Sequence, residues 1–276
     1  MKKEVFAIRL ARITFVCILV LSFLALTACS PVKPEGQLTL QRGTFTFAMS
    51  GLYKPFNYHE TEKGSRLTGF DVDIGKALAK EMGLRPNPVA VPWETIIAGL
   101  QMRKYDAIIG SMGITNKRKK AVNFTDPYYR SGAQIFVAKE NLSIRSADDL
   151  KGKTIGVVKA TTFKDVALEY SSDIVEYTSD ITALQDLPTG RVDAVITDRA
   201  VGLYAMSKMN FLIKDIDTPL TEDEMGIAIH KGDRELRQKL NQALEQIIKD
   251  GTYEKISYRY FNRNILRTTT DENNKE

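Results

Sequence analysis

Cysteine and histidine are scarce in this chain of 276 residues, which has two of each. Cys17 lies in an N-terminal apolar stretch that we expect to be removed, and Cys29 is expected to be blocked by modification. No thiol then remains for a disulfide, a nucleophile or a cysteine-ligated metal site. The histidines, His59 and His230, are isolated and lack the spacing of metal ligands. We therefore expect no metal and no cofactor.

The chain also lacks a large net charge. The formal net charge is +5, but residues 1–28 hold four basic residues and one acidic residue, so the remainder carries about +2. The basic clusters, at 117–120 and near the C-terminus, alternate with acids or lie on exposed faces. Nucleic acid is therefore not an expected partner. The length that remains suffices for one large domain or two modest ones.

The N-terminus is organised as an export signal. A basic start precedes an apolar run, 13–26, that is too short and wrongly flanked for a permanent membrane span. Leu26-Thr27-Ala28-Cys29 matches a bacterial lipoprotein processing site, and an ordinary secretory signal with an incidental cysteine is the alternative. We expect removal of 1–28, lipidation of Cys29 on the extracytoplasmic face of the cell membrane, and a polar tether over 29–43. The polar residues 267–276 are expected to be disordered.

Alternating strand and helix patterns indicate an α/β fold with parallel strands covered by helices. The first run predicts strands at 44–49, 87–91 and 105–110 and helices at 71–82 and 94–102. The alternation of strands and helices then begins again. Strands are predicted at 133–138, 154–158, 174–177 and 192–197, and helices at 163–170, 182–187 and 199–209. A strand at 225–230, a helix at 233–249 and a last helix ending near Phe261 close the chain. Two such units suggest a cleft between them.

Residues 105–132 contain the most informative local pattern. A buried strand leads into a loop with Gly, Ser and Thr, and Arg118 follows at the start of a basic helical turn. Loop N–H groups and hydroxyls can bind a small carboxylate, and an arginine can add two parallel, charge-assisted hydrogen bonds. A solvated surface arginine is the alternative. Ligands bind beyond the carboxyl ends of parallel strands, so the loops at 50–56, 110–118 and 159–163 and the loop carrying Asp198 are expected to converge.

Six segments occur in an order that resembles the polar amino acid group of bacterial extracellular solute-binding proteins, the receptors of ABC importers. They are YKPF at 53–56, GFDVDI at 69–74, ITNKRKK at 114–120, FTDPYY at 124–129, DLKGK at 149–153 and KDGTY at 249–253. The resemblance covers about 44–262 and implies the two-lobed periplasmic-binding-protein fold. Each lobe would be a mostly parallel sheet with flanking helices, and two hinge crossovers would join them. Lobe one is then 44–129 plus 225–264, and lobe two is 133–221.

The resemblance also implies ligand contacts. Arg118 would bind the α-carboxylate of an amino acid, Thr162 would reach the same group from lobe two, and Asp198 would pair with the α-ammonium. Tyr53 and Trp93 would sandwich the ligand side chain. A buried zwitterion needs both a cation and an anion, so the residue types agree with this reading. Trp93 as a core residue, Tyr53 as the brace of a turn and Asp198 as a helix N-cap are the alternatives.

Three positions depart from the family pattern. Gly113 stands where many relatives have a hydroxyl that contacts the amine, which leaves Ser111 and a backbone carbonyl to do more. Ala160 and its neighbours replace a loop that contains Gly-Thr. Ser50 occupies a position that is often acidic in receptors for basic ligands, which argues against lysine or arginine. A polar, neutral or sulfur-bearing amino acid, cystine among them, is favoured.

The expected function is capture of a free amino acid by hinge closure and its delivery to an ABC permease with its ATPase subunits. The protein would act as a monomer held at the membrane by its lipid anchor. Two alternatives stay open. One is a dehydratase of cyclic acids on the same fold, which would need a free cleft carboxyl group to protonate a leaving hydroxyl. The other is a ligand sensor that signals through a partner.

Overall fold

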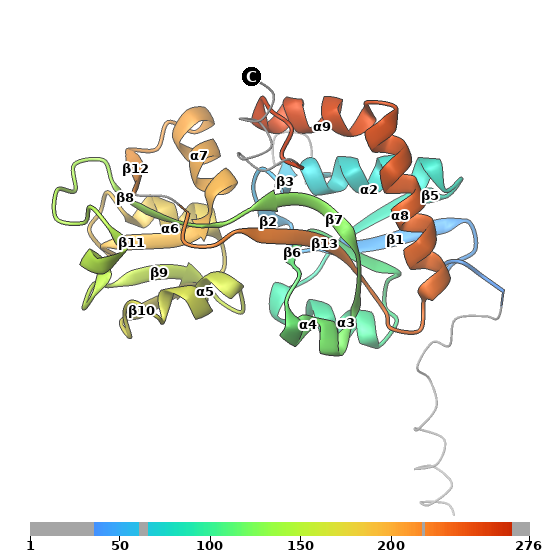
Figure 1. Ribbon diagram of the computed structural model, residues 1–276, viewed down its shortest axis with the longest axis horizontal. Helices are drawn as coiled ribbons and strands as arrows, with labels where there is room; N and C mark the ends of the chain where they lie inside the picture. Colours follow the sequence, from blue (N-terminus) through green and yellow to red (C-terminus); the bar gives the residue numbers. More distant parts are fainter. Residues whose placement is uncertain (1–35, 61–65, 217–218, 267–276) are drawn as a thin grey trace, which may run out of the picture.

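A computed structural model of the chain describes residues 36–60, 66–216 and 219–266. The predicted signal peptide, Cys29, the start of the tether and the C-terminal tail lie outside the described residues. Figure 1 shows two α/β lobes side by side along the longest axis of the molecule. Within the described ranges, no helix is both long and apolar enough to cross a membrane.

Lobe one is built on a five-stranded sheet with the order β5-β1-β6-β13-β7. The strands are β1 (Thr44–Met49), β5 (Arg85–Ala90), β6 (Ala107–Gly113), β7 (Asn123–Ser131) and β13 (Asp223–Ile229). β1 is parallel to β5 and β6, whereas β13 is antiparallel to both β6 and β7. The carboxyl ends of β1 and β6 therefore lie at the same edge of the sheet, toward lobe two (Figure 1).

Helices cover both faces of this sheet because successive side chains of its strands point to opposite sides. Phe45, Phe47 and Met49 of β1 pack in one apolar cluster with three helices, whereas Ala48 packs in another. The first cluster includes residues of α2 (Phe70–Glu81), α8 (Arg234–Lys249) and α9 (Thr252–Phe261). The opposite face carries η1 (Trp93–Thr95), α3 (Ile96–Gln101) and α4 (Asn116–Ala121). Figure 1 shows α3 and α4 below the sheet.

Lobe two repeats this plan with a five-stranded sheet in the order β10-β9-β11-β8-β12. Its strands are β8 (Ala133–Ala138), β9 (Ile155–Val158), β10 (Ile174–Tyr177), β11 (Ala194–Asp198) and β12 (Ile213–Ile216). Its helices are η2 (Ala147–Leu150), α5 (Thr162–Ala167), α6 (Asp180–Asp186) and α7 (Arg199–Lys208). Phe163 of α5 packs on one face, and Leu184 of α6 and Val201 of α7 pack in the cluster on the other.

The chain crosses between the lobes at two closely spaced segments. The first runs from β7 to β8 through Gly132, and the second leads from lobe two into β13. The N–H of Ala133 donates to the Thr221 hydroxyl across the two segments at 3.0 Å. A Cβ atom on Gly132 would lie 1.8 Å from the Thr221 carbonyl oxygen, so the crossing leaves no room for a side chain there.

The strands that lead into and out of these crossings explain why both sheets are mixed. Each sheet has two parallel and two antiparallel pairings, and the antiparallel pairings involve β7 and β13 in lobe one and β8 and β12 in lobe two. The parallel part of each sheet is the part that the alternating strand and helix patterns predicted. The sequence patterns do not predict β7 as a strand of nine residues.

The sequence patterns do not predict two other features of the structure. A small antiparallel sheet is formed by β2 (Leu52–Tyr53), β3 (Asn57–Glu60) and β4 (Arg66–Thr68), and β12 forms the edge of the sheet in lobe two. These strands have two to four residues, too few to show a period of two. β5 begins two residues before its predicted start and contains Pro86 and Pro88, which an edge strand tolerates.

Candidate functional site

A cavity lies between the two lobes and contains about 540 Å³ of space free of protein atoms, part of which is open to solvent. This volume is in the range of small-molecule sites in proteins. Six of the seven candidate ligand-binding residues line it, namely Tyr53, Trp93, Ser111, Gly113, Arg118 and Thr162. The seventh, Asp198, does not. The cavity thus brings together residues from the three loops that follow β1, β6 and β9, as the arrangement of parallel strands predicts.

Arg118 is a partly buried cation in the wall of this cavity. Its N–H donates to the hydroxyl of the α4 N-cap Thr115 at 3.1 Å, which fixes the start of the helix. Its guanidinium donates to the Gly113 carbonyl oxygen at 2.9 Å and lies 5.7 Å from the centre of the Trp93 ring. Burial lowers the pKa of the guanidinium, and the charges of Asp165 and Asp223 oppose that shift.

No carboxylate of the described residues forms an ion pair with Arg118. A guanidinium has five N–H donors, and the carbonyl of Gly113 occupies one of them. The remaining donors can form the bidentate pair that guanidinium groups make with carboxylates. This arrangement can bind a small carboxylate that enters the cavity.

A buried hydrogen-bond network supports the part of the cavity wall formed by Ser50 and Ser111. Asp71 is fully buried and accepts from the Tyr128 hydroxyl at 2.6 Å, from the Asn57 amide at 2.6 Å and from the Ser111 hydroxyl at 2.9 Å. Asn57 in turn accepts from the Ser50 hydroxyl at 3.0 Å. The network ties the loops after β1 and β6 together, although burial raises the pKa of Asp71 to about 6. From the sequence, Asp71 is predicted only to begin a helix.

Two residues beside the cavity have left-handed backbone conformations that favour glycine. Ser111 has a φ of 56° and Ala160 a φ of 60°. The N–H of Ser111 donates to the Tyr128 hydroxyl at 2.8 Å, which helps to hold this conformation. Ala160 belongs to the segment that replaces the Gly-Thr-containing loop implied by the resemblance. Such conformations are costly for residues with a Cβ, and they concentrate at functional sites.

Asp198 lies behind Tyr53, with no exposed surface. It is the N-cap of α7, and its Oδ1 accepts from the Ala200 N–H at 2.7 Å and from the Ser131 hydroxyl at 2.6 Å. Its Oδ2 faces the Tyr129 hydroxyl at 3.4 Å, and the hydroxyl of Tyr53 also bonds to the carboxylate. Burial raises the pKa of Asp198 to about 6. The N-cap role is therefore present, and contact with a ligand amine requires Tyr53 to move aside.

Asp180 lines the cavity from lobe two and is not among the ligand-binding residues predicted from the sequence. It is the first residue of α6 and is 4 % exposed. The Thr197 hydroxyl donates to its Oδ1 at 2.5 Å, and burial raises its pKa to about 6. Its position directly after β10, at the carboxyl end of a parallel strand, is the signal that could have identified it.

Three contacts join the lobes across the rim of the cavity. The indole Nε1 of Trp93 donates to the Ala160 carbonyl oxygen at 3.1 Å. Lys159 and Glu94 form an ion pair at 2.5 Å, which lowers the pKa of Glu94. The Ser179 hydroxyl donates to the Leu52 carbonyl oxygen at 3.3 Å. The lobes therefore touch on the open side of the cleft as well as at the hinge.

A second groove adjoins the cavity. It contains about 910 Å³ of space free of protein atoms, part of it open solvent, and shares Ser50, Leu52, Trp93, Val158 and Thr178 with the cavity wall. Neither Arg118 nor Thr162 lines it. The groove therefore extends the cavity from the end that is away from Arg118. Among the described residues, no group of three or more His, Cys, Asp or Glu is arranged to hold a metal ion.

Comparison with known proteins shows which family and which relatives this chain resembles. The profile of the bacterial extracellular solute-binding proteins, family 3, matches residues 45–263. The chain is 33 % identical over 230 residues to the L-cystine-binding protein TcyJ of Escherichia coli strain K12, with coverage of 82 % of this chain and 86 % of that protein.

Two solved structures are also similar. One is an ancestral arginine-binding protein bound to arginine, with 40 % identity, a TM-score of 0.73 and coverage of 80 % of this chain and 99 % of the other. The second is the ancestral amino acid-binding protein AncCDT-1, described as a precursor of cyclohexadienyl dehydratase, with 37 % identity, a TM-score of 0.73 and coverage of 79 % and 96 %.

Proposed function

The chain belongs to the bacterial extracellular solute-binding proteins, family 3, and we propose that its cavity binds the α-carboxylate of a free amino acid through Arg118. The protein captures an amino acid and delivers it to an ABC importer, as its relatives do. The observation that carries the proposed contact is a guanidinium in the cavity wall that makes no ion pair within the described part of the chain.

In this proposal, both lobes contact the ligand. Arg118, Ser111, Tyr53 and Trp93 belong to lobe one, and Thr162 belongs to lobe two, so all contacts form together when the lobes meet. Micromolar affinity corresponds to about 8 kcal/mol of binding free energy. One charge-assisted carboxylate pair and aromatic contacts around the side chain suffice for this amount after the cost of ordering the ligand.

A thermal-shift screen of the purified protein against the common amino acids and cystine tests the proposal. A ligand present at one hundred times its Kd stabilises the folded state by about 2.7 kcal/mol, which raises the melting temperature measurably. Calorimetry on each hit then gives the Kd. A protein whose melting temperature responds to none of these compounds would not be an amino acid receptor.

We further propose that the ligand is a polar, neutral or sulfur-containing amino acid, with cystine among the candidates. Ser50 in place of an acid supports this class, as does the similarity to a protein named as cystine-binding. The screen ranks the compounds directly.

Catalysis is the competing function, because AncCDT-1 is described as a precursor of a dehydratase. Asp180 and Asp198 have pKa values raised by burial to about 6, so a protonated carboxyl group is available near the cavity. We propose that these acids bind ligand cations instead and that the protein is not an enzyme. Incubation with arogenate or prephenate, followed by chromatography, tests this. Production of an aromatic acid that stops in a doubly substituted Asp180→Asn, Asp198→Asn protein would establish the enzyme.

The place of action is part of the same proposal. Cys29 is the lipidated N-terminus of a mature protein that remains at the extracytoplasmic membrane face as a monomer, and a permease with its ATPase subunits receives the ligand. Cys29→Ser should release the protein from the membrane fraction after cell lysis. Retention of that variant with the lipid would refute anchoring at this cysteine.

A further inference from the structure

We propose that Asp180 binds a second positively charged nitrogen at the far end of the ligand, so that the preferred ligand is an amino acid with two cationic nitrogens. Cystine has this chemistry and belongs to the class proposed above. Lysine and arginine also have it, and binding of either would mean that Asp180 outweighs the absence of an acid at Ser50. The inference rests on the proposed function and concerns its specificity.

The charges around the cavity support this assignment. An α-amino acid head group has one carboxylate and one ammonium, and each needs one opposite charge when it leaves water. The cavity has one lining cation, Arg118, and one lining carboxylate, Asp180. Of the two buried carboxylates behind its wall, Asp71 accepts three hydrogen bonds within lobe one, and Asp198 is bonded to Tyr53. If Asp198 pairs with the α-ammonium, Asp180 is left without a counter-charge. A second cation on the ligand supplies it.

No basic side chain of the described residues pairs with Asp180. Its interactions are the hydrogen bond from Thr197, a bond from its own backbone and repulsion from Asp198. A carboxylate that is 4 % exposed and faces a ligand cavity without a basic partner matches the situation of Arg118, with the opposite sign.

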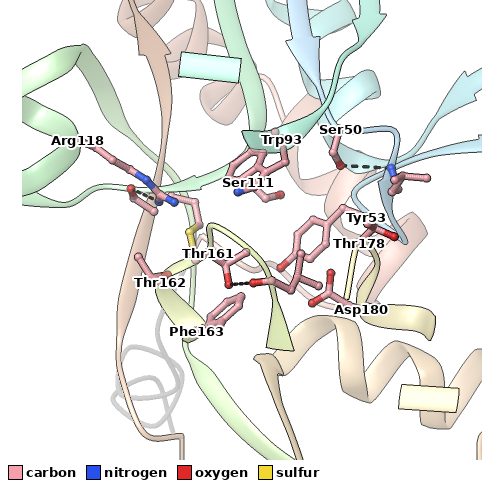
Figure 2. Close-up of a pocket in the computed structure, with 15 residues that line it drawn as sticks. Ser50, Tyr53, Trp93, Ser111, Arg118, Thr161, Thr162, Phe163, Thr178 and Asp180 are labelled. Atoms are coloured by element: carbon pink, nitrogen blue, oxygen red, sulfur yellow. Dashed lines mark hydrogen bonds between the residues drawn. The ribbon is translucent and has the colours of Figure 1, made fainter. Parts of the chain in front are cut away.

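The position of Asp180 places the second nitrogen away from the ligand head group. Figure 2 shows Arg118 and Thr162 on one side of the cavity and Asp180 on the other, with Tyr53 near Asp180. The α-carboxylate and α-ammonium are bonded to the same carbon, so a group that meets Asp180 while the carboxylate meets Arg118 lies further along the ligand.

The cavity offers room for such a ligand. Thr178 lies on the same side as Asp180 in Figure 2 and also lines the adjoining groove. A long side chain can therefore pass Trp93 and Tyr53 toward the end where the cavity opens into the groove. The acid that Ser50 lacks in lobe one is then supplied by Asp180 from lobe two.

A purely structural role for Asp180 accounts for fewer observations. An acid in the first turn of a helix is favoured by the helix dipole, and the Thr197 bond ties α6 to β11. These interactions explain why Asp180 is stable at this place. They do not explain why the carboxylate lines the cavity opposite an unpaired guanidinium.

Calorimetry with matched ligand pairs tests the inference. Lysine with norleucine and arginine with citrulline differ in the second cationic nitrogen. Cystine with S-methylcysteine is a third pair, whose members differ in a whole second head group, with its ammonium and its carboxylate. We expect the wild type to bind the dicationic member of at least one pair tenfold or more tightly, and the pair identifies which source of the cation the site takes. In Asp180→Asn, whose amide oxygen can still accept from Thr197, that ratio should fall at least tenfold.

Asp215→Asn is the matched control, because it removes the same charge from the same lobe on β12, outside the cavity. It should keep the wild-type ratio. If Asp180→Asn fails to fold, Asp180→Ser replaces it, and melting temperatures report on folding for both variants.

Two results would overturn the inference while leaving amino acid binding intact. One is a wild type that does not discriminate within any pair, and the other is an Asp180→Asn protein that loses affinity for both members of a pair equally, as an α-ammonium partner would. A wild type that binds none of the six compounds and no other amino acid would overturn the proposed function together with the inference.

Discussion

Trp93 in lobe one and Ala160 in lobe two are joined across the cleft by a hydrogen bond of 3.1 Å from the indole Nε1 to the carbonyl oxygen. The indole also lines the cavity and lies beside the Arg118 guanidinium. The Trp93 side chain therefore bonds to the opposite lobe, lines the cavity and lies beside the proposed carboxylate site. Opening of the cleft would break this hydrogen bond and expose the indole to water.

Trp93 is the only tryptophan of the chain, so intrinsic fluorescence reports on this place alone. We expect a saturable change in tryptophan emission when the bound amino acid is added, because closure removes water from the indole and brings it to the Ala160 carbonyl. A fluorescence titration measures this, and calorimetry under the same conditions should give the same Kd.

Trp93→Phe is the control, since it keeps an aromatic ring but removes the N–H donor and the fluorophore. The signal should disappear, and affinity should fall by about threefold to tenfold, which is the effect of one hydrogen bond of about 1 kcal/mol. Ligand binding without any change in the emission of the wild type would mean that the cleft does not rearrange at Trp93.

Ligand affinity should depend on pH in the range near 6. Burial raises the pKa of Asp180 and of Asp198 to about 6, and a ligand ammonium binds the ionised form of either acid. Affinity should therefore weaken as the pH falls from 7 to 5, and binding near pH 6 should release protons. Calorimetry in two buffers of different ionisation enthalpy measures that release. Binding with no proton exchange at pH 6 would contradict the role of these acids.

The ligand-free protein should show the opposite dependence. The folded state holds protons on Asp71, Asp180 and Asp198 up to about pH 6, whereas the unfolded chain releases them near 3.8. The contribution of these groups to the free energy of unfolding is therefore present below about pH 4 and is lost as the pH rises through 6. Melting temperatures of the wild type and of Asp180→Asn between pH 4 and 7 should converge at the acidic end. A constant difference between the two would be inconsistent with this account.

The crossing at Gly132 leads to a prediction about stability and ligand affinity. A Cβ there would lie 1.8 Å from the Thr221 carbonyl oxygen, so Gly132→Ala must separate the two crossing segments. Overpacking of this kind costs about 1–3 kcal/mol, or about 2–4 °C of melting temperature per kcal/mol for a chain of this size. Ligand affinity should fall as well, because the lobes no longer meet in the same orientation.

Gly190→Ala is the comparison for that variant. A Cβ atom added to Gly190 would have no neighbour within 4 Å, and the φ there is 75°, so alanine strains the backbone without forcing segments apart. It should lower the melting temperature without weakening ligand binding. Equal loss of affinity in both variants would show that the crossing at Gly132 is not what orients the lobes.

The parts of the fold that could be predicted are those with a long local signal. The strands β1 and β6 and the helix α8 have apolar patterns that extend over six or more residues, and the loops that follow parallel strands must meet at one edge. The mixed character of the sheets could not be predicted in this way. It results from the crossing strands, whose partners are more than ninety residues apart in the case of β7 and β13.

The site was predicted in part for the same reason. Arg118 stands out because a single arginine follows a loop of small residues, and the structure places it in the cavity. Asp180 and Asp71 begin helices, where an acid is common for local reasons, so their sequence context does not distinguish them. Only the packing of lobe two shows that one of these carboxylates lines the cavity. The roles assigned to all of these residues stay predictions until they are measured.

The central claim is that Arg118 binds the ligand carboxylate, and calorimetric titration of Arg118→Ala tests it most directly. Lys119→Ala is the matched control, since it removes a basic residue from the same helix at an exposed position. We expect Arg118→Ala to lose more than about 2 kcal/mol of binding free energy, or about thirtyfold in Kd, with an unchanged melting temperature in the absence of ligand. Lys119→Ala should bind like the wild type. An Arg118→Ala protein that binds its amino acid with the wild-type Kd would contradict the claim.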